Sequence, residues 1–125
     1  MKILLSIKSQ YVDKIASGEK RYEFRKVNFR RKDISSIIVY SSGRQKKIVG
    51  EIMFKKVLHD TPEKIWELTQ NEAGLSWESF MDYYKGKNNA YAIVIEEFIP
   101  YNKAISLEEK YPGKRAPQSF LYIDE

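Results

Sequence analysis

The alternation of hydrophobic and polar positions changes period several times along the chain, and each change predicts a new element. Lys2 to Ile7 is an apolar run with β-branched residues, which predicts a buried first strand. The residues that follow place apolar side chains three and four positions apart, a spacing typical of a short amphipathic helix. Ser9 is its predicted N-cap, and Gly18 is predicted to end it.

A period of two follows this helix and continues to about Val27, which predicts a strand. Successive side chains of a strand point to opposite faces, so Tyr22 and Phe24 share one face, which we expect to be core. The charged residues on the other face are Arg21, Glu23 and Arg25. Asn28 to Asp33 is predicted to be a polar, basic connection.

A hairpin is predicted in the middle of the chain. Ile34 to Ser41 and Lys47 to Leu58 are rich in strand-forming residues and are separated by a turn of small and polar residues. Gly50 lies inside the second strand and predicts a bulge or a tight bend, with a plain weak point in the strand as the alternative.

Two short helices are predicted after the hairpin. Thr61 followed by Pro62 is typical of a helix start, and Gly74 is predicted to end that helix. Ser76 is the predicted cap of the second helix, which runs from Trp77 to about Lys85.

The last part of the chain contains one clear strand, Ala90 to Ile99, which Pro100 is predicted to end. Tyr101 to Ala116 is predicted to be irregular, and Ser119 to Ile123 to be a short final strand. Strictly alternating strand and helix units are missing. The chain is therefore predicted to be a single α+β domain over residues 1–125, a small barrel of five or six mostly antiparallel strands with two or three short helices.

Composition excludes several kinds of chemistry. The chain has no cysteine and one histidine, which excludes disulfides, thiolate catalysis and cysteine-zinc sites. No cofactor and no structural metal are expected. No apolar run approaches the length of a membrane span, so we expect a cytoplasmic protein with no membrane contact.

The net charge of +5 is concentrated in one segment. Between Lys20 and Lys32, seven basic residues accompany a single acidic one, and the remainder of the chain is close to neutral. A local basic patch beside aromatic residues is typical of a site for a phosphate-bearing partner, with a solvated loop as the alternative.

The charged residues of the predicted strand at 22–27 are the candidates for this site. Lys20 follows the helix end at Gly18, and Glu23 and Arg25 come next on one strand face. Opposed charges therefore converge near one turn and predict a polar cleft. A structural ladder of salt bridges is the alternative.

Gly18, Lys20, Glu23 and Arg25 match the G-x-K-x-x-E-x-R signature of the ASCH domain family, and nearly the whole chain resembles that family. The motif follows a first strand and helix and precedes a strand-rich middle, and the ending from Pro117 to Phe120 is also similar. The resemblance implies a PUA-like β-barrel with helices at its rim and a cleft beside them. It also implies a role in RNA metabolism or transcription-coupled regulation.

RNA, single-stranded or looped, or a nucleotide is the expected partner of such a cleft. Arg25 and Lys20 suit a phosphate, and ionised Glu23 suits the amino or imino edge of a base. The predicted nucleic-acid-binding residues are Gly18, Lys20, Arg21, Glu23, Arg25, Lys26, Arg30 and Arg31.

Enzymatic alternatives stay open. One branch of the ASCH-like family resembles an amidohydrolase acting on acetylated cytidine, in which the motif lysine activates a threonine nucleophile. Lys20 is retained here, but Glu23 stands at the threonine position and would act as a base for water. Glu72 lies near that branch's acidic proton donor. A ribonuclease using Lys20 and Glu23 is a further alternative, and a protein-interaction module is the third.

Overall fold

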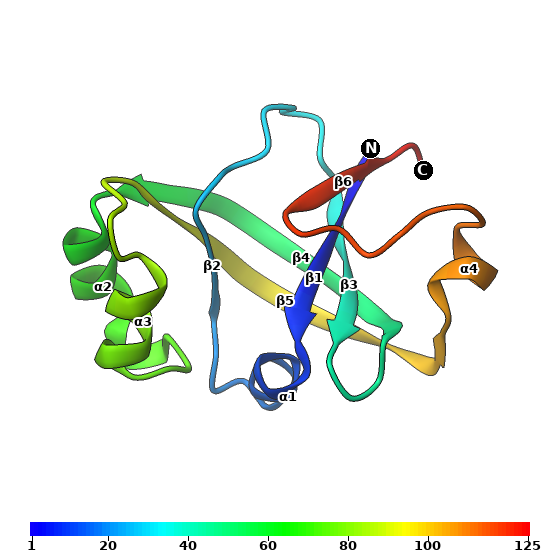
Figure 1. Ribbon diagram of the computed structural model, residues 1–125, viewed down its shortest axis with the longest axis horizontal. Helices are drawn as coiled ribbons and strands as arrows, with labels where there is room; N and C mark the ends of the chain where they lie inside the picture. The colour runs from blue at the N-terminus through cyan, green and yellow to red at the C-terminus, as the bar shows by residue number, and fades with distance from the viewer.

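The strands form one sheet that curls into a half-barrel in the computed structural model, which describes residues 1–125 (Figure 1). The strand order is β2-β5-β4-β3-β1-β6. β1 and β3 are parallel, and the other neighbouring pairs are antiparallel. The predicted α+β class is therefore confirmed. The strands are β1 (Lys2–Lys8), β2 (Tyr22–Arg25), β3 (Ser36–Ser42), β4 (Lys47–Asp60), β5 (Ala90–Ile105) and β6 (Phe120–Ile123).

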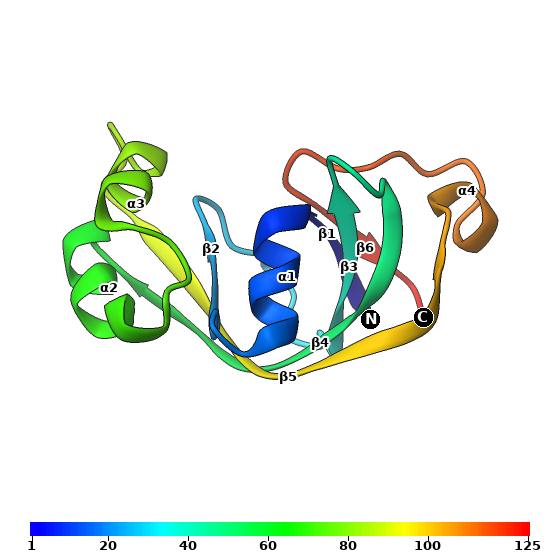
Figure 2. The same cartoon turned by 90° about the horizontal axis from the view of Figure 1, so that it is seen from below.

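Four α-helices surround the sheet. α1 lies inside its curve, and α2 and α3 lie together at the far end of the long β4–β5 hairpin (Figure 2). The segment that was predicted to be irregular contains the fourth helix, which has only four residues. The helices are α1 (Ser9–Ser17), α2 (Pro62–Thr69), α3 (Trp77–Tyr83) and α4 (Leu107–Lys110), and a 3-10 turn, η1 (Gln70–Glu72), follows α2.

The core consists of three apolar clusters. The largest packs Val12 and Ile15 of α1 against the inner side of the sheet. The second joins Phe24 of β2 to α2 and α3, and the Phe24 and Phe80 rings meet edge to face with centroids 5.0 Å apart. The third lies where β1, β3 and β4 meet the C-terminal strand. The prediction that the aromatic face of β2 is core is confirmed.

The helix starts after the hairpin are confirmed, but the predicted N-cap of α1 is wrong. Thr61 and Ser76 cap α2 and α3 through their side chains. In α1 the cap position is occupied by Lys8, which makes no side-chain cap bond, and Ser9 is the first helical residue. The Ser9 hydroxyl instead joins the helix to β3, 2.9 Å from Ser41 Oγ and 2.6 Å from Ser42 O. Tertiary hydrogen bonding takes precedence over local capping here.

Pro100 does not end β5, contrary to the prediction, because its partner is the irregular residue Gly50. The two residues pair where the β4–β5 register shifts, and a bulge is one of the few places where a sheet accepts proline. A Cβ atom on Gly50 would lie 2.5 Å from Ile99 O, so only glycine fits this approach. The bend predicted at Gly50 is therefore confirmed, and it lets β5 continue to Ile105.

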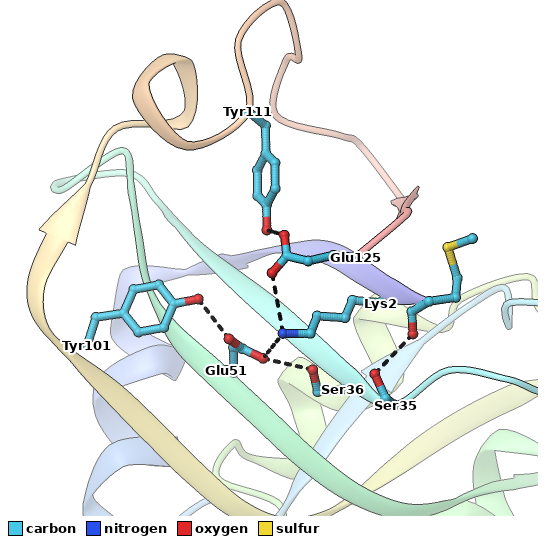
Figure 3. A network of polar contacts seen from close by, with 8 residues as sticks. Lys2, Ser35, Ser36, Glu51, Tyr101, Tyr111 and Glu125 are labelled. Atoms are coloured by element: carbon cyan, nitrogen blue, oxygen red, sulfur yellow. Dashed lines mark hydrogen bonds and ion pairs between the residues drawn. The ribbon is translucent and has the colours of Figure 1, made fainter.

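A polar network joins the end of the chain to the sheet (Figure 3). Lys2 Nζ lies 3.0 Å from Glu51 Oε1 and 3.4 Å from Glu125 Oε1. Three hydroxyl groups donate hydrogen bonds to these two carboxylates, those of Ser36, Tyr101 and Tyr111. The network connects β1, β3, β4, β5 and the residue after α4 to the last residue of the chain.

Candidate functional site

A pocket of about 400 Å³ lies beside the motif strand β2. Its walls come from the end of β1, from α1, β2 and α3, and from the segment before β6. The lining residues are Ser6, Ile7, Lys8, Tyr11, Lys20, Glu23, Phe24, Arg25, Leu75, Ser79, Asp82, Tyr83 and Gln118. Three separate stretches of the chain, residues 6–25, residues 75–83 and Gln118, therefore contribute to one cavity.

Lys20 is placed in the pocket by the way α1 ends. Gly18 adopts a left-handed φ of +87° and closes the helix with a 3.2 Å hydrogen bond to Ile15 O. The chain then turns, and the Lys20 side chain lies almost completely buried, with 2% of its surface exposed. Lys20 Nζ donates to Ala73 O at 2.9 Å and lies 4.5 Å from the centre of the Phe24 ring.

This environment changes the acidity of the Lys20 ammonium. Burial is the largest influence, and with the nearby charge of Lys14 it lowers the pKa of Lys20 to about 8, although Glu23 acts in the opposite direction. An ordinary lysine titrates near 10.5. Lys20 is therefore a lysine whose charge changes close to neutral pH, a property that clusters at functional sites.

Glu23 and Arg25 form a partly enclosed ion pair on the pocket wall. Arg25 Nη1 lies 3.3 Å from Glu23 Oε2, and only 8% of the Glu23 side chain is exposed. Arg25 Nη2 also donates to Ser119 O at 2.9 Å, which holds the segment before β6 against the pocket. The predicted convergence of Lys20, Glu23 and Arg25 is present in the structure.

The helix α3 supplies a wall that the sequence did not identify as part of the site. Ser79, Asp82 and Tyr83 are spaced three and four residues apart and line the pocket from one helix face. The Tyr83 hydroxyl donates to Phe24 O at 3.3 Å, and Lys26 Nζ lies 4.5 Å from the centre of the Tyr83 ring. The i, i+3, i+4 spacing of these polar residues can be seen in the sequence, but no nearby residue in the chain indicates that they face β2.

Six of the predicted residues do not line the pocket, although two of these lie next to it: Gly18 forms the turn before Lys20, and Lys26 lies against the Tyr83 ring. Arg21 is exposed and donates to Ile95 O, and the exposed Glu72 contributes its backbone carbonyl to Arg21 N rather than its carboxylate to the site. Arg30 and Arg31 lie in the loop before β3, where their backbone N–H groups donate to the Tyr122 hydroxyl.

Lys8, Ser79 and Asp82 are lining residues that sequence reasoning missed, whereas Gln118 belongs to the ending already noted for its resemblance. The one histidine, His59, is exposed and stacks on Tyr91, and its Nε2 lies 2.9 Å from Asn89 Oδ1. Neither of these contacts is with a residue that lines the pocket. It takes no part in the site.

An open groove of about 700 Å³ lies between the end of β5 and α4, but it contains none of the motif residues and no buried charge. No group of three or more His, Cys, Asp or Glu side chains is arranged to hold a metal ion. None of the helices has both the length and the apolar character that a membrane crossing requires.

Solved structures share this fold. The chain superposes on ASCH from Zymomonas mobilis with a TM-score of 0.88 at 23% identity, over 99% of this chain and 88% of that one. A mutant form of the same protein gives a TM-score of 0.88 over 99% and 91% of the two chains. The predicted resemblance to ASCH domains is thus confirmed at the level of the PUA-like fold.

Two relatives carry functional names. An ASCH domain-containing ribonuclease from Zymomonas mobilis is 23% identical over 122 residues, which cover 96% of this chain and 82% of the relative. The large ribosomal subunit protein uL22 of Ureaplasma parvum is 29% identical over 87 residues, or 70% of this chain. The chain spans only 28% of the length of that ribosomal protein.

A family match extends over almost the whole sequence. Residues 2–124 match the family described as Domain of unknown function (DUF365). The chain therefore belongs to this family, and it has the fold of the ASCH proteins.

Proposed function

We propose that the protein binds RNA or a nucleotide in the pocket beside β2, through the residues that match the ASCH signature. The observation that carries this proposal is the enclosure of Lys20, Glu23 and Arg25 in one cavity of about 400 Å³. That volume is within the range of pockets that hold small ligands. Lys20 and Glu23 are buried in this cavity, and burying charged groups costs free energy.

The chemistry of the lining suits a nucleotide. The guanidinium of Arg25 and the ammonium of Lys20 supply positive charge for a phosphate. The carboxylate of Glu23 accepts hydrogen bonds and suits the amino or imino edge of a base. The Tyr11 and Tyr83 side chains on the walls offer ring surface for base stacking.

The basic segment after β2 extends the positive surface beyond the pocket. Lys26 is exposed and lies against the Tyr83 ring at the pocket wall. Arg31 is engaged by Asp33, with Nη2 2.6 Å from Oδ2, so Lys26 and Arg30 carry more of the contact with an RNA backbone in this proposal. The names of the two relatives, a ribonuclease and a ribosomal protein, support an RNA ligand.

The test is a titration of the protein into end-labelled single-stranded RNA at low and high salt, with bound, free and shortened RNA resolved on gels. We expect intact RNA to be retained, and to be retained less at high salt because phosphate contacts release counterions. Lys20→Ala should weaken retention, whereas Lys56→Ala, which removes an exposed lysine outside the pocket, should change it little. Equal effects of the two variants would reject the pocket.

A ribonuclease is the second candidate, and the pKa of Lys20 near 8 is the observation that favours it. With a pKa near 8, part of the Lys20 population is neutral at slightly alkaline pH and can accept a proton there, and Glu23 lies in the same pocket. In the same gels, shortened RNA that disappears with Glu23→Gln would establish hydrolysis. Retention that is merely weakened or relaxed by Glu23→Gln, with no shortened RNA, would instead support binding.

A further inference from the structure

Residues 72–74 comprise the last residue of η1 and the first two residues of the loop before α3, and they are hydrogen-bonded to α1 and to the residues just before β2. Their three consecutive carbonyl groups each accept a hydrogen bond from that region. The donors are Lys14 Nζ at 3.0 Å, Lys20 Nζ at 2.9 Å and the Arg21 backbone N at 2.9 Å. Such a run of partners holds the segment in one position against Lys20.

Gly74 is the point of closest approach. A Cβ atom built on Gly74 would lie 2.5 Å from Lys20 Cβ, 2.7 Å from its Cγ and 3.0 Å from its Cδ. Gly74 also has a φ of +75°, a left-handed conformation that favours glycine. The aliphatic stem of Lys20 therefore lies directly on the backbone of Gly74, a position that no larger residue permits.

We propose that residues 72–74 are the element that positions Lys20 in the pocket, and that Gly74 is the positioning residue that makes this contact possible. The inference rests on the proposed role of Lys20 in ligand binding, and it assigns a function to a segment that does not itself line the pocket. A side chain at position 74 would push the lysine stem away and move its ammonium from Ala73 O.

The consequence is electrostatic as well as geometric. Residues 72–74 cover Lys20, and burial is the main cause of its lowered pKa. Displacing the segment should therefore admit water and restore ordinary acidity. The titratable or charged groups around Lys20 come from four elements and are Lys8, Tyr11, Lys14, Glu23, Arg25, Asp82 and Tyr83.

The test is an NMR titration of the lysine side-chain Cε signals, with Lys20 assigned by its absence in Lys20→Arg. In Gly74→Ala we expect the midpoint of Lys20 to rise by about one unit or more as the lysine becomes solvated. Gly86→Ala is the matched control, because Gly86 has a φ of +78° and open space around its Cβ position. Equal midpoints in the two variants would overturn the proposal.

A second variant covers the case in which Gly74→Ala does not fold. Lys14→Met removes the bond to Gly74 O and also a positive charge near Lys20. Loss of the charge alone also raises the midpoint, and salt screens a partly buried pair only in part, so the hydrogen exchange of the Arg21 amide, which donates to Glu72 O, separates the two effects. A raised midpoint with faster Arg21 exchange supports the positioning role, whereas no rise, or a rise with unchanged exchange, refutes it.

Neither titration contains RNA, so their outcome is independent of the binding gels. Retention of RNA with an unchanged Lys20 midpoint in the loop variants would reject Gly74 as a positioning residue and leave the binding function standing. A raised midpoint without any RNA retention would reject the binding function alone.

Discussion

Lys20 is the residue at which stability and the proposed function oppose each other. The residue is 2% exposed, and its ammonium has one carbonyl partner, Ala73 O, in place of the several water molecules it would have in solvent. The pKa lowered to about 8 measures this cost, because burial disfavours the charged form. Two consequences can be measured, one in binding and one in stability.

The first prediction concerns the pH dependence of RNA binding. Lys20 is charged below its pKa of about 8 and neutral above it, so its attraction for phosphate should be lost as the pH rises from 7 to 9. Retention of RNA should fall over this interval in the native protein. In Lys20→Arg the guanidinium stays charged throughout, so whatever affinity that variant has should not change with pH. A native profile that is equally flat would contradict the prediction.

The second prediction concerns the free energy of unfolding. The folded-state pKa of Lys20 is lower than the unfolded value of 10.5, so the burial cost is fully present below about pH 8. Between these two values the unfolded chain holds a proton that the folded chain has released, and stability rises with pH. Lys20→Met should therefore stabilise the protein by about 1 to 3 kcal/mol at pH 7, less near pH 10. Denaturant unfolding at both pH values checks this, and a destabilised variant at pH 7 would contradict it.

The pairing of β4 with β5 is the main determinant of shape at the scale of elements. Both strands are long, and they run along the molecule between the end that carries α2 and α3 and the end that carries α4 (Figure 2). Their register shifts at three places, one of them the Gly50 and Pro100 pair. These irregularities bend the hairpin and give the sheet its curve, since bulges increase local twist.

The third prediction follows from the contact at Gly50. In Gly50→Ala the new methyl group would meet the backbone oxygen of Ile99, which cannot rotate away as a side chain does. The free energy of unfolding should fall by about 2 kcal/mol or more. Gly113→Ala is a control in open space, with only the cost of its positive φ. Thermal or denaturant unfolding of both variants measures this loss. Equal losses of unfolding free energy would show that the close approach at Gly50 does not determine the cost.

Sequence reasoning identified most elements because their signals are local. The period of β2, the cap residues Thr61 and Ser76, and the bend at Gly50 depend on nearby residues and are confirmed. The errors at Ser9 and Pro100 have a common cause. In both cases the deciding partner, β3 or Gly50, is distant in sequence, and a local rule gives way to it.

The residues of the candidate site also divide into those that nearby sequence predicts and those that depend on distant partners. Lys20, Glu23 and Arg25 are close in sequence, so their convergence followed from strand geometry. Asp82 and Gln118 reach the pocket only through the packing of α3 and of the segment before β6, which no local pattern encodes. The carboxylate of Glu72 lies elsewhere because the backbone of that loop, rather than its side chain, contacts the motif.

At the scale of the whole molecule, the network in Figure 3 joins the first strand to the last residue. Glu51 receives hydrogen bonds from Ser36, Lys2 and Tyr101. Burial alone would raise the pKa of Glu51, but these bonds outweigh it and lower the pKa. Glu125 has a lowered pKa too, chiefly because the Tyr111 hydroxyl donates to it.

The fourth prediction concerns acid stability. Because the folded-state pKa of Glu51 is lowered, its contribution is present above the unfolded value of 4.5 and is lost as the pH falls through the folded value. Glu51→Gln should lower the free energy of unfolding at pH 7 by about 1 to 2 kcal/mol and by less at acid pH. Glu97→Gln, an exposed position on β5, is the control. A loss that is the same at pH 7 and pH 3 would contradict the prediction.

The strand order has a consequence for how the protein is made. β2 is synthesised second, yet its only neighbour in the sheet is β5, with Tyr22 paired to Val94 and Arg25 to Tyr91. Arg25 also donates a hydrogen bond to the carbonyl of Ser119, which lies 94 residues later in the chain. A chain emerging from the ribosome therefore carries the whole motif long before it has a pocket. Such long-range pairing slows folding, so the proposed ligand pocket forms only after the residues up to Ser119 have been released.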